Sequence, residues 1–204
     1  MDPPFFLFAP GAGAPSSHPW MQAWKKHLEK LGRVVAFDYS YMSEGRRRPD
    51  PLPQLIDTHR RALSENRRPD DRVFLIGKSM GGRIGCHVSL VEKISGLICL
   101  GYPLCGGGDP AKLRDKVLRD LMTQVLFVQG TRDPLSPLDL LETVRFQMKA
   151  PNTLHVVEGA DHSLLLRKRD LTRTDRTQEE VDEEILGVIA GFVRQVIVNR
   201  DIIA

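Results

Sequence analysis

Short runs of apolar, β-prone residues recur along the chain, and longer stretches with helical periodicity separate them. Each run is almost continuously apolar rather than alternating, which is typical of parallel strands covered on both faces. The runs lie at residues 5–10, 33–39, 72–77, 96–103, 124–130 and 153–159. The helical patterns lie at residues 18–31, 54–65, 81–91, 111–121, 137–149 and 178–198. This alternation predicts an α/β protein with a doubly wound parallel sheet of about six strands and helices on both faces.

The connections between these elements restrict the topology. With the strands numbered along the chain, right-handed crossovers favour the order 2-1-3-4-5-6, in which the winding reverses between strands 1 and 3. The length of 204 residues suits one domain, so we expect residues 1–204 to form a single domain. The interval 103–123 is too short for a cap domain. We predict loops at the Gly-rich segment 105–110 and at the charged segment 168–176, and a capping box of Thr177 and Glu180.

A G-x-S-x-G motif lies between the third strand and the helix that follows it. It reads Gly77-Lys78-Ser79-Met80-Gly81, after the strand 72–77 and before the helix 81–91. A sharp strand-to-helix turn of this kind lifts the serine hydroxyl out of the sheet, and its flanking residues must be small. This context predicts that Ser79 is a nucleophile.

Other interpretations of these glycines fit less well, although G-x-S-x-G by itself also arises by chance. A Walker-type phosphate loop ending in GKS would need glycine at position 72, where the chain has Arg72. A dinucleotide-binding fingerprint beginning at Gly11 would need glycine at position 16, where the chain has Ser16.

An acid and a base follow the nucleophile in the order that a hydrolytic triad on such a sheet requires. Asp133 comes just after the strand 124–130, and His162 comes just after the strand 153–159. The carboxyl ends of parallel strands meet at one sheet edge, so these side chains are expected to lie together. Glu158 is the alternative acid, and Asp161 is interpreted as a turn residue.

The loop after the first strand is rich in small residues, which lets backbone approach a substrate closely. We predict an oxyanion hole formed by the backbone N–H groups of Met80 and Ala12. Gly11, Gly13 and His18 are candidates for lining the substrate site. An ester-like bond cleaved in this way requires no cofactor and no metal.

Composition narrows the possible partners. The net charge of +3 is too small to indicate nucleic-acid binding, and no apolar run is long enough to span a membrane. Three cysteines without metal-like spacing favour a reducing compartment, and the apolar start of the chain is too short for a signal peptide, so we expect a cytoplasmic protein. A small-molecule substrate is expected, and a protein partner or a homodimer is left open.

The chain resembles the α/β-hydrolase superfamily over nearly its whole length. More narrowly, it resembles the dienelactone-hydrolase-like family that contains testis-expressed protein thirty and the third subunit of the NSL histone acetyltransferase complex. The segments that carry the likeness are FAPGAGAP (8–15), FDYSY (37–41), GKSMGGR (77–83), LICLGYPL (97–104), LFVQGTRDP (126–134) and GADHS (159–163). The resemblance implies that Ser79, Asp133 and His162 are catalytic, and it implies no particular substrate.

Two features depart from the superfamily pattern. The first loop begins with Pro10-Gly11 where His-Gly is usual, and the chain starts at the strand that is usually third. The leading hypothesis is a serine hydrolase that cleaves a small ester or thioester through an acyl-enzyme on Ser79. The alternative is a non-catalytic protein-interaction scaffold. If the basic residues in 167–176 fold over the crevice, they would favour anionic substrates.

Overall fold

The computed structural model describes residues 3–203, with side chains up to residue 199. A six-stranded, fully parallel sheet forms its centre, in the order β2-β1-β3-β4-β7-β8. Because β5 and β6 lie outside this sheet, the order is the predicted 2-1-3-4-5-6. The strands are β1 (Phe5–Ala9), β2 (Arg33–Ala36), β3 (Val73–Lys78), β4 (Gly96–Leu100), β7 (Val125–Gly130) and β8 (Asn152–Val157).

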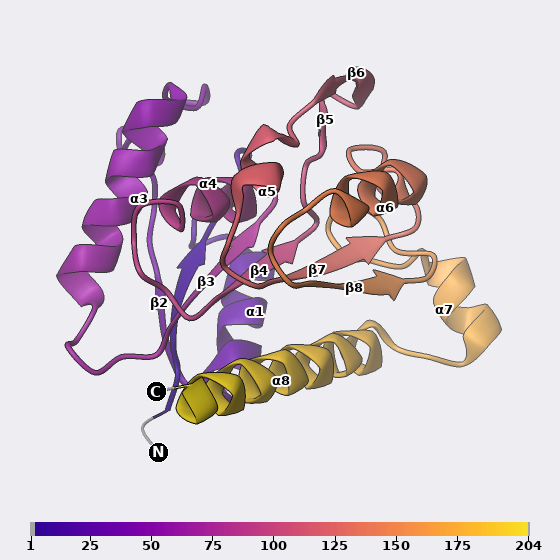
Figure 1. Ribbon diagram of the computed structural model, residues 1–204. Helices are drawn as coiled ribbons and strands as arrows, with labels where there is room; N and C mark the ends of the chain where they lie inside the picture. Colours follow the sequence, from indigo (N-terminus) through magenta and orange to yellow (C-terminus); the bar gives the residue numbers. More distant parts are fainter. Residues whose placement is uncertain (1–2, 204) are drawn as a thin grey trace.

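Helices cover both faces of the sheet, as predicted (Figure 1). One face is covered by α1 (Pro19–Glu29) and α8 (Gln178–Ile203). The opposite face is covered by α3 (Leu52–Asn66), α4 (Met80–Val88), α5 (Lys116–Asp120) and α6 (Leu138–Phe146). The capping box at the start of α8 is confirmed: the Thr177 N–H donates to Glu180 Oε2 at 2.7 Å and the Glu180 N–H donates to Thr177 Oγ1 at 3.2 Å.

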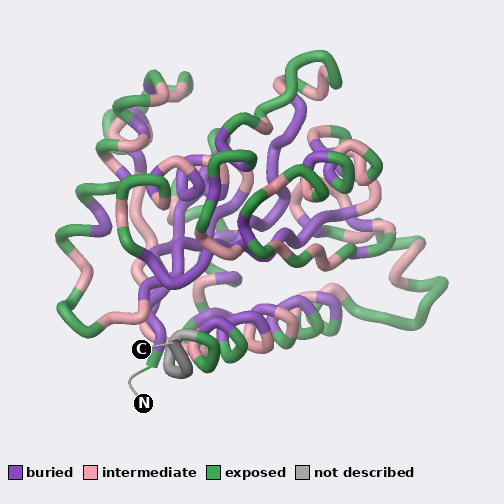
Figure 2. Tube along the Cα trace, viewed as in Figure 1, coloured by how far each residue is buried: buried purple, intermediate pink, exposed green. Residues whose placement is uncertain are grey.

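The central strands are buried on both faces, which explains why their sequences do not alternate. In β1, Phe5 and Leu7 join the core beneath α3 and α4, whereas Phe6 and Phe8 join the core beneath α1 and α8. None of these side chains is exposed. Figure 2 shows the same pattern, with buried strands at the centre and exposed outer helix surfaces.

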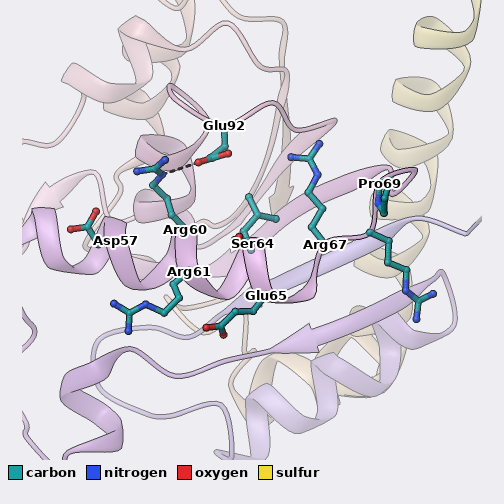
Figure 3. Close-up of a pocket in the computed structure, with 10 residues that line it drawn as sticks. Asp57, Arg60, Arg61, Ser64, Glu65, Arg67, Pro69 and Glu92 are labelled. Atoms are coloured by element: carbon teal, nitrogen blue, oxygen red, sulfur yellow. Dashed lines mark hydrogen bonds and ion pairs between the residues drawn. The ribbon is translucent and has the colours of Figure 1, made fainter.

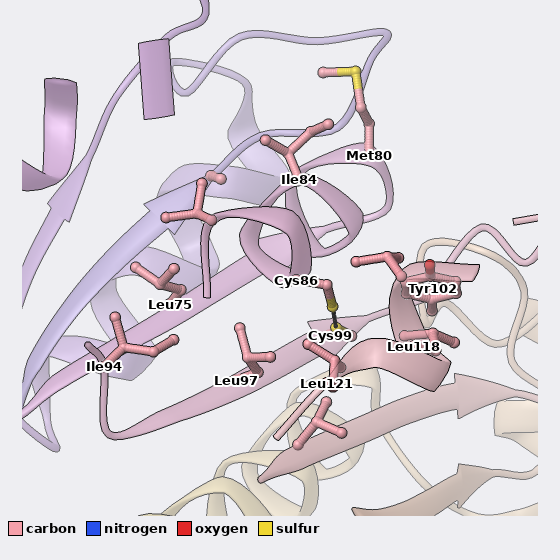
Figure 4. Packing of buried hydrophobic residues seen from close by; sticks show 14 of the residues in the cluster. Leu75, Met80, Ile84, Cys86, Ile94, Leu97, Cys99, Tyr102, Leu118 and Leu121 are labelled. Atoms are coloured by element: carbon pink, nitrogen blue, oxygen red, sulfur yellow. Dashed lines mark hydrogen bonds between the residues drawn. The ribbon is translucent and has the colours of Figure 1, made fainter. Parts of the chain in front are cut away.

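Helix α4 is fixed to the sheet by close apolar packing (Figure 4). Ile84 is fully buried, and Cys86 Sγ lies 3.9 Å from Cys99 Sγ on β4. Cys86, Cys99 and Cys105 are all buried free thiols. This packing holds the helix that begins directly after Ser79.

The predictions for residues 105–121 were partly wrong. The segment 105–110 is not a loop but opens a hairpin of β5 (Cys105–Gly106) and β6 (Asp109–Leu113), and the predicted helix 111–121 shrinks to α5. Gly107 and Gly108 adopt positive φ angles of 65° and 78°, which produce the tight turn. Between β4 and β7 the structure contains this hairpin and α5, and no cap domain occurs in the described residues (Figure 1).

The charged segment 168–176 was also predicted wrongly as a loop. It contains helix α7 (Lys168–Thr174), which ends at Asp175 in the left-handed conformation with φ 50°. Only Leu171 packs against the core, so the segment lacks the apolar periodicity by which a helix is recognised. Two smaller differences are a short helix α2 (Ser40–Ser43) after a second strand that ends at Ala36, and an α3 that begins at Leu52 rather than at residue 54.

Candidate active site

Ser79 occupies a sharp turn between β3 and α4, as the motif predicted. Its φ of 50° and ψ of −115° are unusual for a residue with a side chain. Its N–H donates to the carbonyl of Leu100 on β4 at 3.0 Å. The turn places the hydroxyl at the carboxyl edge of the sheet, beside the amino end of α4.

The glycines beside Ser79 are required by close backbone approach. A Cβ on Gly77 would lie 2.2 Å from the nitrogen of Gly82. A Cβ on Gly81 would lie 2.5 Å from the carbonyl oxygen of Ala9 at the end of β1. Both distances are far below van der Waals contact, so any side chain at either position would force the backbone to move.

The structure brings the three predicted triad side chains together from loops after β3, β7 and β8. His162 Nε2 lies 2.8 Å from Ser79 Oγ, and His162 Nδ1 lies 2.7 Å from Asp133 Oδ2. The Asp133 side chain is fully buried, whereas a quarter of the His162 side chain is exposed. A carboxylate only accepts hydrogen bonds, so Nδ1 carries the proton and Nε2 is free to accept one from the serine hydroxyl. The alternative acid, Glu158, instead accepts a 3.3 Å hydrogen bond from Thr131 Oγ1.

Two further groups hold Asp133. Gln129 Nε2 donates to Asp133 Oδ2 at 2.5 Å, and the Leu135 N–H donates to Asp133 Oδ1 at 2.8 Å. Gln129 is fully buried within β7. The carboxylate that orients the imidazole is therefore itself fixed.

The loop after β1 is supported from residues 38–41. Tyr41 Oη donates to the carbonyl of Ala12 at 2.8 Å, and the Ser16 N–H donates to Asp38 Oδ1 at 2.6 Å. Burial, followed by the nearby carboxylates of Asp50 and Asp38, raises the pKa of Tyr41 to about 12, so its hydroxyl remains a donor.

The two predicted oxyanion donors have no competing acceptor. Among the described residues, neither the Met80 N–H nor the Ala12 N–H donates a hydrogen bond to the protein. Met80 is the first residue of α4, where backbone N–H groups have no partner within the helix. Both groups are therefore free to bind a developing negative charge.

A pocket of about 340 Å³ opens beside Ser79 and His162. Gly11, Gly13 and His18, which the sequence suggested as lining residues, all line it. Ala12, Ala14, Trp20, Met21, Lys78, Ser79, His162 and Ser163 complete the lining. A larger hollow of about 760 Å³ lies beside α3, where Arg60 pairs with Glu92 at 2.8 Å (Figure 3), but no triad residue lines it.

None of the basic residues in 167–176 lines the pocket, and several of them pair with nearby acids. Arg173 and Arg169 lie 3.7 Å from Asp170, and Arg176 lies 2.7 Å from Glu184. From the sequence we expect anionic steering only if these basic residues fold over the crevice, and they do not line it.

The chain matches a family model described as an alpha/beta hydrolase domain over residues 2–193. The chain belongs to the α/β hydrolase family. Solved structures with the same fold include an alpha-beta serine hydrolase homologue from Coxiella burnetii, at 20% identity and a TM-score of 0.67 over 89% of this chain and 84% of that one. Est1E from Butyrivibrio proteoclasticus, with ferulic acid bound, is 18% identical with a TM-score of 0.67 over 93% and 90%. A dienelactone hydrolase from Anabaena variabilis is 17% identical with a TM-score of 0.64 over 89% and 85%.

The described residues of this α/β hydrolase contain neither a candidate metal site nor a candidate membrane-spanning helix. No group of three or more His, Cys, Asp or Glu side chains there is arranged to hold a metal ion. No helix among them is long and apolar enough to cross a membrane. His162, which lines the pocket, is instead hydrogen-bonded to the buried Asp133 and to Ser79.

Sequence reasoning missed four residues that support the α/β hydrolase site: Trp20, Tyr41, Lys78 and Gln129. Gln129 was visible as a polar residue within an apolar strand, and Lys78 as a cation before the nucleophile. A buried polar side chain has to be paired, and this was the available signal. The partners of Trp20, Tyr41 and Lys78 are remote in sequence. The partner of Gln129 is only four residues away, but no local pattern shows that its side chain reaches Asp133.

Gln129 gives a first testable prediction. Gln129→Leu keeps the volume of the side chain but removes the donor to Asp133, so we expect kcat to fall roughly 10-fold with little change in KM. Gln147→Leu, at an exposed position after α6, is the matched control. Steady-state kinetics on a short-chain ester checks this, with thermal unfolding measured in parallel. An unchanged kcat for Gln129→Leu would show that Asp133 needs no such positioning residue.

Proposed function

We propose that this α/β hydrolase is a serine hydrolase that cleaves a small ester or thioester through an acyl-enzyme on Ser79. The observation that carries the proposal is the continuous hydrogen-bonded path from Asp133 through His162 to Ser79 Oγ. A serine hydroxyl is a weak nucleophile until a base accepts its proton, and this path supplies both the base and the group that orients it.

Acylation follows from these positions. Ser79 Oγ attacks the carbonyl carbon while His162 Nε2 takes the hydroxyl proton, and Asp133 stabilises the resulting imidazolium. The negatively charged oxygen that forms accepts hydrogen bonds from the N–H groups of Met80 and Ala12. The tetrahedral intermediate then collapses, and His162 returns the proton to the departing alcohol or thiol.

Deacylation repeats the sequence with water. His162 removes a proton from a water molecule, which attacks the acyl-serine carbonyl, and the same two N–H groups hold the oxyanion. Collapse breaks the bond to Ser79 Oγ, which regains its proton from His162, and a carboxylic acid leaves. The net reaction consumes one water for each ester or thioester cleaved.

The size of the pocket supports a small substrate. Its volume of about 340 Å³ lies at the low end for ligand sites, and the hairpin and α5 are the only elements between β4 and β7. An uncapped cleft excludes water poorly from a long acyl chain. Short acyl groups, or acyl groups presented on a larger molecule, fit this shape better than long lipids.

The test is activity-based labelling of the purified protein. We expect a fluorophosphonate probe to modify Ser79 and phenyl acetate to be hydrolysed between pH 6 and 9, with the adduct located by peptide mass spectrometry. Absence of both labelling and turnover across this range would favour the alternative, a protein-interaction scaffold. That outcome would also fit the narrower resemblance to testis-expressed protein thirty and the NSL complex subunit, some relatives of which serve within protein complexes.

A further inference from the structure

Lys78 is a buried cation directly beside the nucleophile. Alternation along β3 directs Phe74 and Ile76 to the face beneath α1, and Lys78 follows them on that face. The stem of Lys78 packs below the first loop, since a Cβ on Gly11 would lie 3.5 Å from Lys78 Cγ. Only 8% of the residue is exposed, yet it lines the pocket that contains Ser79.

The ammonium of Lys78 is incompletely partnered. Lys78 Nζ donates to the backbone carbonyl of His162, and it lies 5.7 Å from the centroid of the Trp20 ring. In the part of the chain that the structure describes, no carboxylate forms an ion pair with it. An ammonium has three donors and buried charges are normally paired, so this group has capacity for an anionic ligand.

The electrostatic environment of Lys78 also favours an anionic ligand. Burial lowers the pKa of Lys78 to about 8, and the carboxylates of Asp133 and Asp161 act in the opposite direction without restoring the usual value. A carboxylate entering the pocket would stabilise the charged form that burial disfavours. The other titratable groups that line the pocket are His18 and His162.

A purely structural role does not require this charge. The loop that carries His162 is already held by Trp20 Nε1, which donates to the carbonyl of Ser163 at 2.9 Å. Asp161 Oδ1 accepts from the N–H groups of Ser163 at 2.7 Å and Leu165 at 3.1 Å. A neutral donor such as the Trp20 indole suffices to hold a carbonyl, whereas a desolvated ammonium is costly.

We propose that Lys78 is a specificity-determining residue that binds a carboxylate of the substrate, so that the preferred ester or thioester is anionic. The inference rests on the proposed serine hydrolase function and adds the substrate class. Because Lys78 adjoins Ser79 in the chain and lines the same pocket, the carboxylate lies a few bonds from the scissile carbonyl. Half-esters of short dicarboxylic acids, and esters of small carboxylated alcohols, meet this requirement.

The test compares anionic and neutral esters of similar size. Monophenyl succinate is paired with phenyl butyrate, and 3-acetoxybenzoate is paired with phenyl acetate. The first pair places the carboxylate in the acyl part and the second in the leaving group. The Ser79→Ala variant serves as the blank for spontaneous hydrolysis, which is appreciable for the succinate.

Lys78→Met removes the charge and keeps an unbranched stem, whereas Lys78→Arg keeps the charge. In at least one pair, we expect Lys78→Met to lower the ratio of anionic to neutral kcat/KM roughly 10- to 100-fold, and Lys78→Arg to retain most of the ratio. The wild-type ratio should fall as pH rises through about 8, because deprotonation removes the charge, and this dependence should vanish in Lys78→Met.

The ratio cancels the contribution of His162, which is the base for both esters, and His18→Gln tests the remaining histidine of the pocket. An equal loss on anionic and neutral esters, or no change in either ratio, would overturn the carboxylate subsite. Failure of the serine hydrolase itself would be recognised separately, since the wild type would then neither hydrolyse any of the four esters nor react with a neutral fluorophosphonate.

Discussion

Ser79→Ala is expected to lower kcat for ester hydrolysis by roughly 10⁴-fold or more and to abolish fluorophosphonate labelling. The variant removes the atom 2.8 Å from His162 Nε2 and leaves the buried Asp133 and its partners in place. Turnover and labelling are measured on the purified variant. The fold should be retained, because alanine is smaller than serine and the substitution removes only a partly exposed hydroxyl, and thermal unfolding checks this.

The matched control is Ser17→Ala. Ser17 is exposed, lies close in sequence to the first loop and does not line the pocket. It should label and turn over like the wild type. Equal labelling of Ser79→Ala and the wild type would show that the reactive serine lies elsewhere.

Gly77→Ala is expected to lower the free energy of unfolding by about 3 kcal/mol or more. Its Cβ would lie 2.2 Å from the Gly82 nitrogen, and the atoms on both sides of this contact are backbone. Neither β3 nor α4 can yield without disturbing the packing of Ile84 and Cys86 on the sheet (Figure 4). Urea unfolding monitored by circular dichroism gives the measurement.

Gly187→Ala is the same substitution at an open position, and there we expect the free energy of unfolding to rise rather than fall. Gly187 is exposed within α8, and a Cβ there meets nothing within 4 Å. Removal of a helical glycine should raise the free energy of unfolding by about 0.5–1 kcal/mol. If the two variants had the same urea midpoint, the close contact between β3 and α4 would be contradicted.

The site depends on where the sheet reverses its winding. β1 and β3 are neighbours, although β2 and α3 separate them in the chain, so the first loop and Ser79 meet at one edge. β7 and β8 add Asp133 and His162 at the same edge. The four loops that build the site therefore come together only after the sheet has formed.

Local sequence patterns predicted much of this structure. Continuous apolar runs identified the six parallel strands. In the four central strands this follows from burial on both faces, which needs apolar side chains at nearly every position, whereas the edge strands β2 and β8 are only partly buried. The small residues around Ser79 identified the turn, because only glycine tolerates the backbone contacts at Gly77 and Gly81. The chain order of Ser79, Asp133 and His162 after successive strands identified the three residues that the structure joins.

Contacts between remote segments were decided only by the tertiary structure. Lys78 lies at the end of a strand, where nothing in the sequence tells that its side chain will reach the carbonyl of His162 after another strand. Helix α7 and the hairpin of β5 and β6 lack an apolar period, so local patterning cannot detect them. By itself the sequence determined the sheet, the turn at Ser79 and the order of the three candidate catalytic residues. The pairing of buried polar groups depends on distances across the fold, and only the folded chain sets these distances.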